Sequence, residues 1–482
     1  MSSGTSDEVL QYAGQFQYDK ATIITSSGAK FPIESGNIIT LHLYEDISRP
    51  FLTGNILFHN SGSISTIGPI IGQEYLELRL KTPALPNQKD TYIDYSEHRF
   101  HIYAMNKLNV GTGSETVRVK FISGEWIKNM RVQISQSLEG SCSQIVDAML
   151  DKVECLKDRF IENSSDFKKI VAPNINPYAV IEIMKRQART AKNNAPNYLF
   201  WESIKGVHFR SLDSIFSQPT KWTYITSPSS SSTFNGMLNI LRDLSVIETC
   251  TMRMNDQLSN TYEGMFGSKL LVHDITTKSY STHFYNYFKE EPGFIHMSNG
   301  QPVYSETPVN EEGFTLADFQ GKVFLTSDNT LPFGARKGRD SQHTTIDGTS
   351  VFEPYAPEKW IQRRQSQMSM FNSGGVGMTI TVPGQTVVSC GDKLNIEIPH
   401  QADLKTDVFP ELDKHWSGGY MVKLIHHTFT TAGMKHKMDI ELYKDSVEES
   451  LDSNADAFEP KADSQGLTYD EFYDAGKDDF YL

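Results

Sequence analysis

Cysteine is scarce in this chain of 482 residues. The four cysteines, Cys142, Cys155, Cys250 and Cys390, are widely scattered, and none forms a Cys-x-x-Cys pair. A disulfide framework needs more cysteines, and a cysteine zinc site needs closely spaced thiolates. The sequence therefore predicts neither structural disulfides nor a cysteine-based metal site.

Long apolar stretches are also missing. The first residues, MSSGTSDEVLQYAG, have neither a positively charged start nor an apolar core. Nowhere does an apolar run reach about 18 residues, the length that a membrane-spanning helix requires. We expect neither a secretory signal nor a membrane-spanning segment.

Positive charge is in deficit. Lys and Arg number 45 and Asp and Glu number 59, so the net charge is −14. Residues 451–482 hold nine acids against Lys461 and Lys477, a balance of −7, which is half of the total. A protein whose main task is to grip nucleic acid phosphates would carry the opposite sign.

Signature motifs of common hydrolases do not occur. The chain contains neither a Gly-x-Ser-x-Gly elbow nor a His-Glu-x-x-His helix. The glycines of SGGVGMT (373–379) follow a helical pattern and precede a strand, whereas a phosphate-binding loop needs the reverse order, so we expect a helix-to-strand turn. A catalytic pair of carboxylates has no sequence signature and stays open among the 59 acids. We predict no catalytic residue and no cofactor.

Histidine pairs in the sequence do not suggest a metal site. Neighbours on a strand point to opposite faces, so His426 and His427 cannot bind one metal ion together. His98 and His101 lie three positions apart, which is an odd separation on a strand, so we expect them to diverge as well. We predict half-buried sheet positions for the adjacent pair and no metal ion.

Residues 1–125 are expected to form a first antiparallel β-domain. Leu76, Leu78 and Leu80 alternate with polar residues, as do Phe100 and Ile102 further on. Turn sequences such as Ser-Gly and Pro-Asn separate these runs. The pattern is typical of a barrel or sandwich.

Helical spacing replaces this alternation in residues 126–196, which we expect to form a helix-rich domain. Ile145, Met149 and Val153 recur at helical intervals, and residues 179–190 contain neither glycine nor proline.

A second β-domain is predicted from residues 197–226 together with 358–450. Lys205-Gly206 is expected to be the turn of an aromatic hairpin, and four alternating strands follow Gly377. Residues 227–357 are expected to be an insertion with a helix and irregular loops, and 451–482 an acidic C-terminal tail. The predicted fold class is α+β and mainly β.

Three sets of segments resemble the central baseplate hub proteins of contractile-tailed, T-even-like bacteriophages. The first set is LHLYEDISRPFLTGNILFHNSGSI (41–64) with IIGQEYLELRL (70–80). The second is HRFHIYAMNKL (98–108) leading through VRVKFISGEWIKN into the Ile145 helix. The third is LFWESIKGVHFRSLDSI (199–215) with CGDKLNIEIPH and SGGYMVKLIHHTFTTAGMKHKMDIELYKDS. Their order and spacing across about 440 residues carry the resemblance.

The resemblance implies a homotrimer in which each chain contributes two tail-tube-like β-barrels, so that three chains form a pseudo-sixfold ring. Such a ring would join the tail tube protein to the central spike protein, contact the baseplate wedges, and leave a channel for genomic DNA. It would be assembled in the host cytoplasm and reside in the tail baseplate of the virion. Residues 290–357 and the acidic tail do not match the family pattern.

Two alternatives remain open. The chain could be the hub of a contractile injection system that carries protein cargo. It could also be a tail-associated polysaccharide hydrolase, with its carboxylates in the insertion.

The end of the acidic tail suggests a docking segment rather than a plain solvated tether. It interleaves five acids with five aromatic residues, namely Tyr469, Phe472, Tyr473, Phe480 and Tyr481. The first three are spaced i, i+3 and i+4, so one helical turn places them on one face. We hypothesise that this segment docks on a neighbouring baseplate subunit with a basic, apolar-floored groove.

Overall fold

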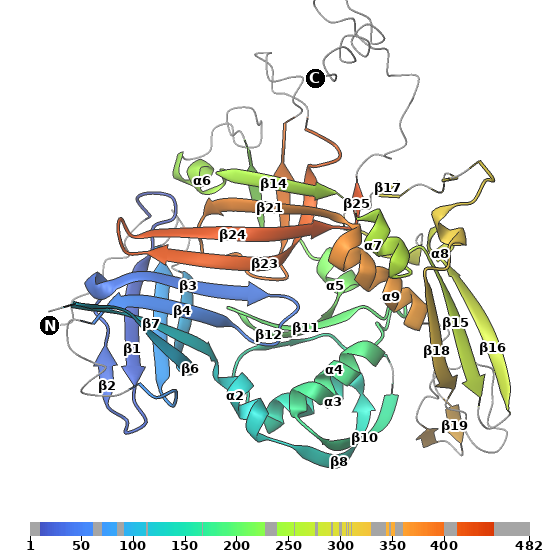
Figure 1. Cartoon of the computed structure of the whole chain (residues 1–482), viewed down its shortest axis with the longest axis horizontal. Coiled ribbons are helices and arrows are strands. Elements are labelled where there is room, and N and C mark those ends of the chain that lie inside the picture. Colours follow the sequence, from blue (N-terminus) through green and yellow to red (C-terminus); the bar gives the residue numbers. More distant parts are fainter. Residues whose placement is uncertain are drawn as a thin grey trace, which may run out of the picture.

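The structure is a computed structural model of the whole chain (Figure 1). It describes residues 10–447 with the exception of 61–69, 84–90, 112–113, 166, 227–238, 255, 275–277, 291–292, 298–300, 305, 307, 310, 329–343, 347–348, 352–359 and 400–411. The described part is mainly β, as the sequence predicted, and the largest sheet has 13 strands. No helix in these ranges is long and apolar enough to span a membrane.

The first β unit is an antiparallel set of strands at the left of Figure 1. Its alternating side chains form one apolar core, as in β4, where Gly54, Ile56 and Phe58 point inward. Gly54 is required there, because a Cβ atom would lie 2.4 Å from the Phe121 ring. The strands are β1 (Gln17–Ile24), β2 (Lys30–Pro32), β3 (Ile38–Asp46), β4 (Thr53–His59), β5 (Tyr75–Thr82), β6 (Thr91–Gly111) and β7 (Ser114–Ser123), with the short helix η1 (Ser35–Asn37) before β3.

The second β unit surrounds its own core of mainly aliphatic side chains. It closes on itself through a backbone hydrogen bond, in which the N–H of Ile247 donates to the carbonyl of Ile225 at 2.9 Å. This bond joins the strand that ends at Ile225 to the segment that leads into the strand beginning at Thr249. Its strands are β13 (Trp222–Ile225), β14 (Thr249–Met254), β21 (Val376–Pro383), β22 (Lys393–Glu397), β23 (Gly418–Thr430) and β24 (Lys435–Lys444). The four alternating runs predicted after Gly377 correspond to β21–β24.

The two β units belong to one continuous sheet (Figure 1). Strand β3 of the first pairs antiparallel with β23 of the second, with Leu41 opposite Phe429 and Leu43 opposite His427. Strand periodicity identifies the buried face of each strand but not its partner, so the sequence could not predict this pairing.

A layer of helices and short strands lies below the β units in Figure 1. Helix α3 begins at a capping box, in which the Ser141 side chain accepts from the N–H of Gln144 and the Gln144 side chain accepts from the N–H of Ser141. The elements are α2 (Gly124–Arg131), β8 (Ile134–Ser141), α3 (Cys142–Lys152), β9 (Arg159–Ile161), β10 (Phe167–Ile175) and α4 (Pro177–Gln187). The predicted helices are present, and the layer also contains the β8–β10 strand pair.

The aromatic hairpin β11 (Tyr198–Ser203) and β12 (Gly206–Ser211) forms as predicted but differs in place and turn. The turn is Ile204–Lys205, one residue earlier than expected, since Ser203 pairs with Gly206. Its strand β12 pairs with β9 of the helical layer, and neither hairpin strand pairs with the second β unit. The hairpin is a middle layer: Trp201 packs among residues of the second unit, and Phe209 among those of α3 and α4.

Residues 227–357 hold more regular structure than the irregular loops expected. Beyond the helices α6 (Asn239–Leu244) and α7 (Gln257–Tyr262), this range supplies β14 and a separate sheet in the order β16–β15–β18, at the right of Figure 1. That sheet consists of β15 (Gly267–Asp274), β16 (Ser279–Asn286) and β18 (Lys322–Asp328). Its short apolar runs gave no clear periodicity in the sequence. Around it lie α8 (Tyr287–Glu290), β17 (Gln301–Pro302), η4 (Leu316–Asp318), β19 (Thr344–Ile346) and β20 (Thr349–Val351).

The remaining elements connect these parts. Helix α5 (Leu212–Phe216) follows the hairpin, and β25 (Ser446–Val447) pairs with β17. Helix α9 (Ile361–Ser369) continues through the π-helical turn η6 (Met370–Gly374) directly into β21. The glycine-rich segment SGGVGMT is thus a helix-to-strand turn, as predicted.

Candidate interaction sites

A buried carboxylate holds the joint between the two β units. Glu45 of β3 is fully buried, and its Oε1 accepts a hydrogen bond from Nε2 of His427 on β23 at 2.8 Å. Its Oε2 accepts from the backbone N–H groups of Cys390 at 3.2 Å and Ile204 at 3.1 Å. One side chain therefore connects both β units and the hairpin turn. Buried charged groups persist only when they are paired in this way.

A second buried histidine extends this contact. Nε2 of His436 lies 3.1 Å from Nδ1 of His427, and its ring stacks on Phe429 with the centroids 4.0 Å apart. Burial lowers the pKa of His436 well below its ordinary value, and His427 lowers it further. A neutral His436 can donate to Nδ1 of His427, which leaves the Nε2 proton of His427 for Glu45.

The opposite face of β23 carries the neighbouring histidine. His426 stacks on Tyr44 with the ring centroids 4.5 Å apart, and its Nε2 lies 2.9 Å from Nδ1 of His42. His426 is partly exposed, whereas His427 is completely buried. The two therefore point to opposite faces, as predicted, but only His426 has the half-buried position expected for the pair.

His98 and His101 both line one cavity of about 320 Å³, but so do Glu97 and Arg99, so the shared cavity does not show that the two histidine side chains point the same way. Strand β6 is irregular around His98. Tyr95 pairs with Leu78 but Phe100 pairs with Leu76, so five positions along β6 lie opposite two positions along β5. A bulge of this kind removes the simple alternation on which the prediction rested. Across the described ranges, no group of three or more His, Cys, Asp or Glu side chains is placed to hold a metal ion.

A buried ion cluster fastens the first β unit to the layers below it. Nζ of Lys157 lies 2.7 Å from Oε2 of Glu125 and also contacts Oε1 of Glu202. It lies 5.2 Å from the centre of the Tyr95 ring on β6. Burial opposes the charge on Lys157, but the two carboxylates outweigh burial and raise its pKa. Burial raises the pKa of Glu202, and Lys157 opposes this rise.

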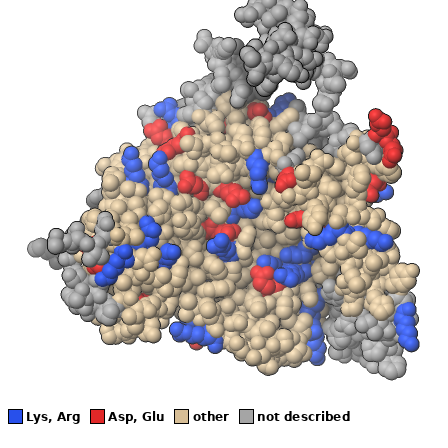
Figure 2. Space-filling model, in the orientation of Figure 1, with Lys and Arg blue, Asp and Glu red and all other residues tan. Residues whose placement is uncertain are grey.

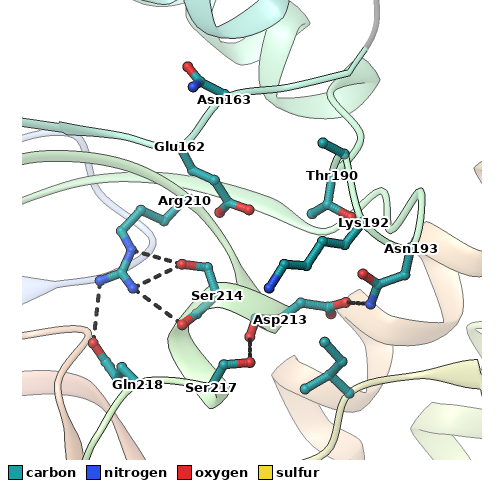
Figure 3. A pocket seen from close by; sticks show the side chains of 12 residues that line it. Glu162, Asn163, Thr190, Lys192, Asn193, Arg210, Asp213, Ser214, Ser217 and Gln218 are labelled. Atoms are coloured by element: carbon teal, nitrogen blue, oxygen red, sulfur yellow. Dashed lines mark hydrogen bonds between the residues drawn. The ribbon is translucent and has the colours of Figure 1, made fainter.

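A cavity of about 470 Å³, lined mainly by residues with polar side chains, opens beside helix α5 (Figure 3). Arg210 donates to the Ser214 hydroxyl at 2.9 Å and to Gln218 Oε1 at 3.3 Å. Asp213 accepts from the side-chain amides of Asn193 at 2.6 Å and Asn197 at 2.8 Å. Other lining residues include Glu162, Asn163, Thr190, Ala191, Lys192, Ser217 and Ile295.

The chemistry of this cavity does not favour catalysis. Burial raises the pKa of Asp213, but each of its oxygens already accepts an amide N–H. Glu162 is likewise held by the backbone N–H and hydroxyl of Ser211. A retaining or inverting hydrolase needs one carboxyl free to donate a proton and one free to attack or to activate water. The lining contains no histidine that could serve as a base.

The sequence did not identify Glu45, Lys157 or Glu202, and no motif marks them. The proposed docking residues Tyr469, Phe472, Tyr473, Phe480 and Tyr481 lie outside the described residues. On the face drawn in Figure 2, basic and acidic side chains are interspersed.

Comparison with known proteins identifies one relative in sequence. A protein of Vibrio phage KVP40, described as a probable baseplate hub protein, is 24% identical over 382 residues, which cover 76% of this chain and 81% of the phage protein. No family model matches. The resemblance to phage baseplate hub proteins drawn from the sequence segments is confirmed, and the chain is related to structural proteins of the viral tail and baseplate.

Two solved structures of tail proteins align with this chain over nearly their whole length. The tail protein from Neisseria meningitidis MC58 gives a TM-score of 0.48 at 8% identity, covering 89% of this chain and 97% of that chain. The 43 kDa tail protein of prophage MuSo2 from Shewanella oneidensis gives 0.47 at 8% identity, with coverages of 88% and 98%.

Proposed function

We propose that this protein is a structural baseplate hub subunit of a contractile phage tail. In this role it forms a homotrimeric ring with pseudo-sixfold symmetry between the tail tube protein and the central spike protein. Its other partners are the baseplate wedges. It is assembled in the host cytoplasm and resides in the tail baseplate of the virion. The relative in Vibrio phage KVP40 supports the baseplate role.

The observation that carries the ring proposal is the pairing of β3 with β23. It fixes two β units edge to edge within one chain, across seven residue pairs from Leu424–Asp46 to Thr430–Thr40. Three chains would then present six such units around one axis. Two similar units per subunit allow a threefold oligomer to match a sixfold tube on one side and a threefold spike on the other.

The charge of the chain suits a ring that genomic DNA passes through without specific binding. A basic lumen would hold the polyanion through the release of counterions, and its grip would depend steeply on salt. The net charge of −14 and the interspersed charges in Figure 2 support a lumen that does not hold DNA.

Two measurements test the proposal. Sedimentation equilibrium of the purified chain should give about three times 54.4 kDa. A cryo-EM map of the intact tail tip should place three copies between tube and spike. A folded chain that stays monomeric at micromolar concentration would contradict the ring.

The two alternatives make different predictions. A hub of a contractile injection system would be encoded without capsid and terminase genes beside it. A tail-associated hydrolase would clear peptidoglycan or polysaccharide as a purified chain. We propose no catalysis and no cofactor, and the relationship to a baseplate hub protein supports this.

A further inference from the structure

The sheet β16–β15–β18, here called the arm, has one apolar face that is open to solvent. Lys269 of β15 pairs with Phe284 on one side and Val323 on the other, so these three side chains share a face. The exposed fraction is 65% for Phe284 and 58% for Val323, and it is 78% for both Tyr280 and Leu325 further along the same face. These four apolar residues and Lys269 define the arm face.

The opposite face already attaches the arm to the body of the protein. Leu270 and Val272 are buried, and Gln362 of α9 donates to the carbonyl of Ser268 at 2.9 Å. The arm face therefore contributes little to holding the fold together. Single exposed apolar side chains are ordinary, but four on adjacent strands of one face are typical of an interaction surface.

Lysine side chains lie on the arm face and in the turn beside it. Nζ of Lys269 lies 5.8 Å from the centre of the Phe284 ring, and exposed Lys278 stands in the turn between β15 and β16. His273 is exposed on the same face. The carboxylates in the sequence of these three strands are Asp274 and Asp328, at the ends of β15 and β18. Such a surface fits a segment that combines acidic and aromatic residues.

The chain itself contains such a segment. Its last described residue, Val447, packs in the same apolar cluster as Met265, Phe266 and Tyr285 at the base of the arm. From there 482 − 447 = 35 residues follow, ending in GLTYDEFYDAGKDDFYL (466–482). The 22 residues from Val447 to Tyr469 can span up to about 70 Å, whereas an eight-residue strand such as β15 is about 27 Å long.

We propose that residues 466–482 dock on the arm face of the same chain. The clustered aromatic side chains of this segment cover the apolar floor, and its acids lie near Lys269 and Lys278. The sequence hypothesis gave a neighbouring baseplate subunit as the partner of this segment. Val447 belongs to the core of the second β unit, which also includes Phe266 and Tyr285 next to and within the arm, and this favours the chain's own arm. The proposal is independent of the hub function.

Photo-cross-linking in the full-length protein tests this placement. Tyr473 is replaced by the photo-reactive amino acid p-benzoylphenylalanine, the protein is irradiated, and the linked peptides are identified by mass spectrometry. We expect the links to join the tail to peptides of β15, β16 or β18 within one chain. Phe284→Asp should lower the yield of these links by about tenfold, the effect of losing the burial of one large apolar side chain.

A matched control uses another small sheet, β8–β10. Val171 on β10 is an apolar side chain with an exposed fraction of 71%, and Val171→Asp should leave the yield unchanged. The melting temperature of each variant confirms that it folds, and Leu325→Asp replaces Phe284→Asp if the latter does not. Raising the salt concentration should also lower the yield, because exposed charge pairs are screened.

Three outcomes would overturn the proposal. They are links to parts of the chain outside the arm, links that join two chains on a denaturing gel, and a yield that folded Phe284→Asp and Leu325→Asp variants both leave unchanged.

Discussion

Glu45 and His427 face each other across the strand pairing that joins the two β units, with His427 Nε2 2.8 Å from Glu45 Oε1 and both side chains fully buried. The second oxygen of Glu45 accepts hydrogen bonds from the backbone N–H groups of Ile204 and Cys390. A shift of β3 against β23 by one residue would break all three contacts. The polar centre of the joint thus fixes the register in which the two units meet.

Replacing Glu45 with alanine should strongly destabilise the protein. Three buried donors would lose their acceptor, so we expect the free energy of unfolding to fall by about 3–5 kcal/mol. Glu45→Gln retains an acceptor oxygen and should cost less. Urea denaturation followed by circular dichroism measures both. His426→Asn, on the opposite face of β23, is the matched control and should cost about 1 kcal/mol or less. A Glu45→Ala variant as stable as the parent would show that the joint does not depend on this carboxylate.

Trp201 is predicted to be a stability determinant and not a binding aromatic. It is fully buried, its Nε1–H donates to the carbonyl of Cys390 at 3.2 Å, and it packs on Gly391, which has a φ of +88°. Trp201→Ala should lower the free energy of unfolding by about 3–5 kcal/mol.

The control for this change is Phe160→Ala on β9. Phe160 has an exposed fraction of 42%, and its replacement should cost much less. If Trp201→Ala instead left the melting temperature unchanged and weakened binding to baseplate partners, the interpretation as a buried member of the fold would be wrong.

The sequence predicted those elements whose signal is local. Leu76, Leu78 and Leu80 alternate on β5 and are all buried, and the Ile145 helix begins at a Ser-x-x-Gln capping box. The pairing of β3 with β23 joins residues separated by 378 to 390 positions, and no local pattern specifies it. The strand β15 contains the run Leu270, Leu271 and Val272, which has no clear period of two and so was not recognised as a strand.

The buried polar groups could not be predicted at all. Glu45, Glu202 and Lys157 are the residue types that normally lie on the surface, and their sequence neighbours do not distinguish them from solvated charges. Their burial arises only when the hairpin, α2 and both β units pack together. The register shift in β6 between Tyr95 and Phe100 was missed for a related reason, because a bulge is not visible in an alternating pattern.

Lys157 should be necessary for the stability of the fold, because its ammonium group pairs with two buried carboxylates. Lys157→Met leaves Glu125 and Glu202 without their shared partner, and we expect a loss of about 3–5 kcal/mol at pH 7. The double variant Lys157→Met/Glu202→Gln removes one of the two charges and should recover a large part of that loss. Denaturant unfolding of the parent, of the single variants Lys157→Met and Glu202→Gln, and of the double variant measures the coupling between the two residues. Losses that simply add would show that Lys157 and Glu202 act independently.

His208 should make the stability of the hairpin layer depend on pH. Its ring lies 4.7 Å from the rings of both Trp201 and Phe160, and its Nε2 lies 2.8 Å from the Ser203 hydroxyl. Burial lowers its pKa from 6.5 to about 3, and the charges of Arg210 and Lys205 act in the same direction.

Because the pKa is lower in the folded state, the unfolded chain binds the additional proton between pH 6.5 and about 3. The contribution of His208 to stability is therefore complete above pH 6.5 and decreases as the pH falls, by about 2 kcal/mol between pH 7 and pH 5. His208→Gln can still bond to Ser203 but does not titrate. The parent should thus lose about 2 kcal/mol more than this variant between the two pH values, as measured by urea unfolding. His436 titrates in both proteins and cancels in the comparison. Equal losses would show that the folded protein accommodates a protonated His208, in conflict with its burial between the two rings.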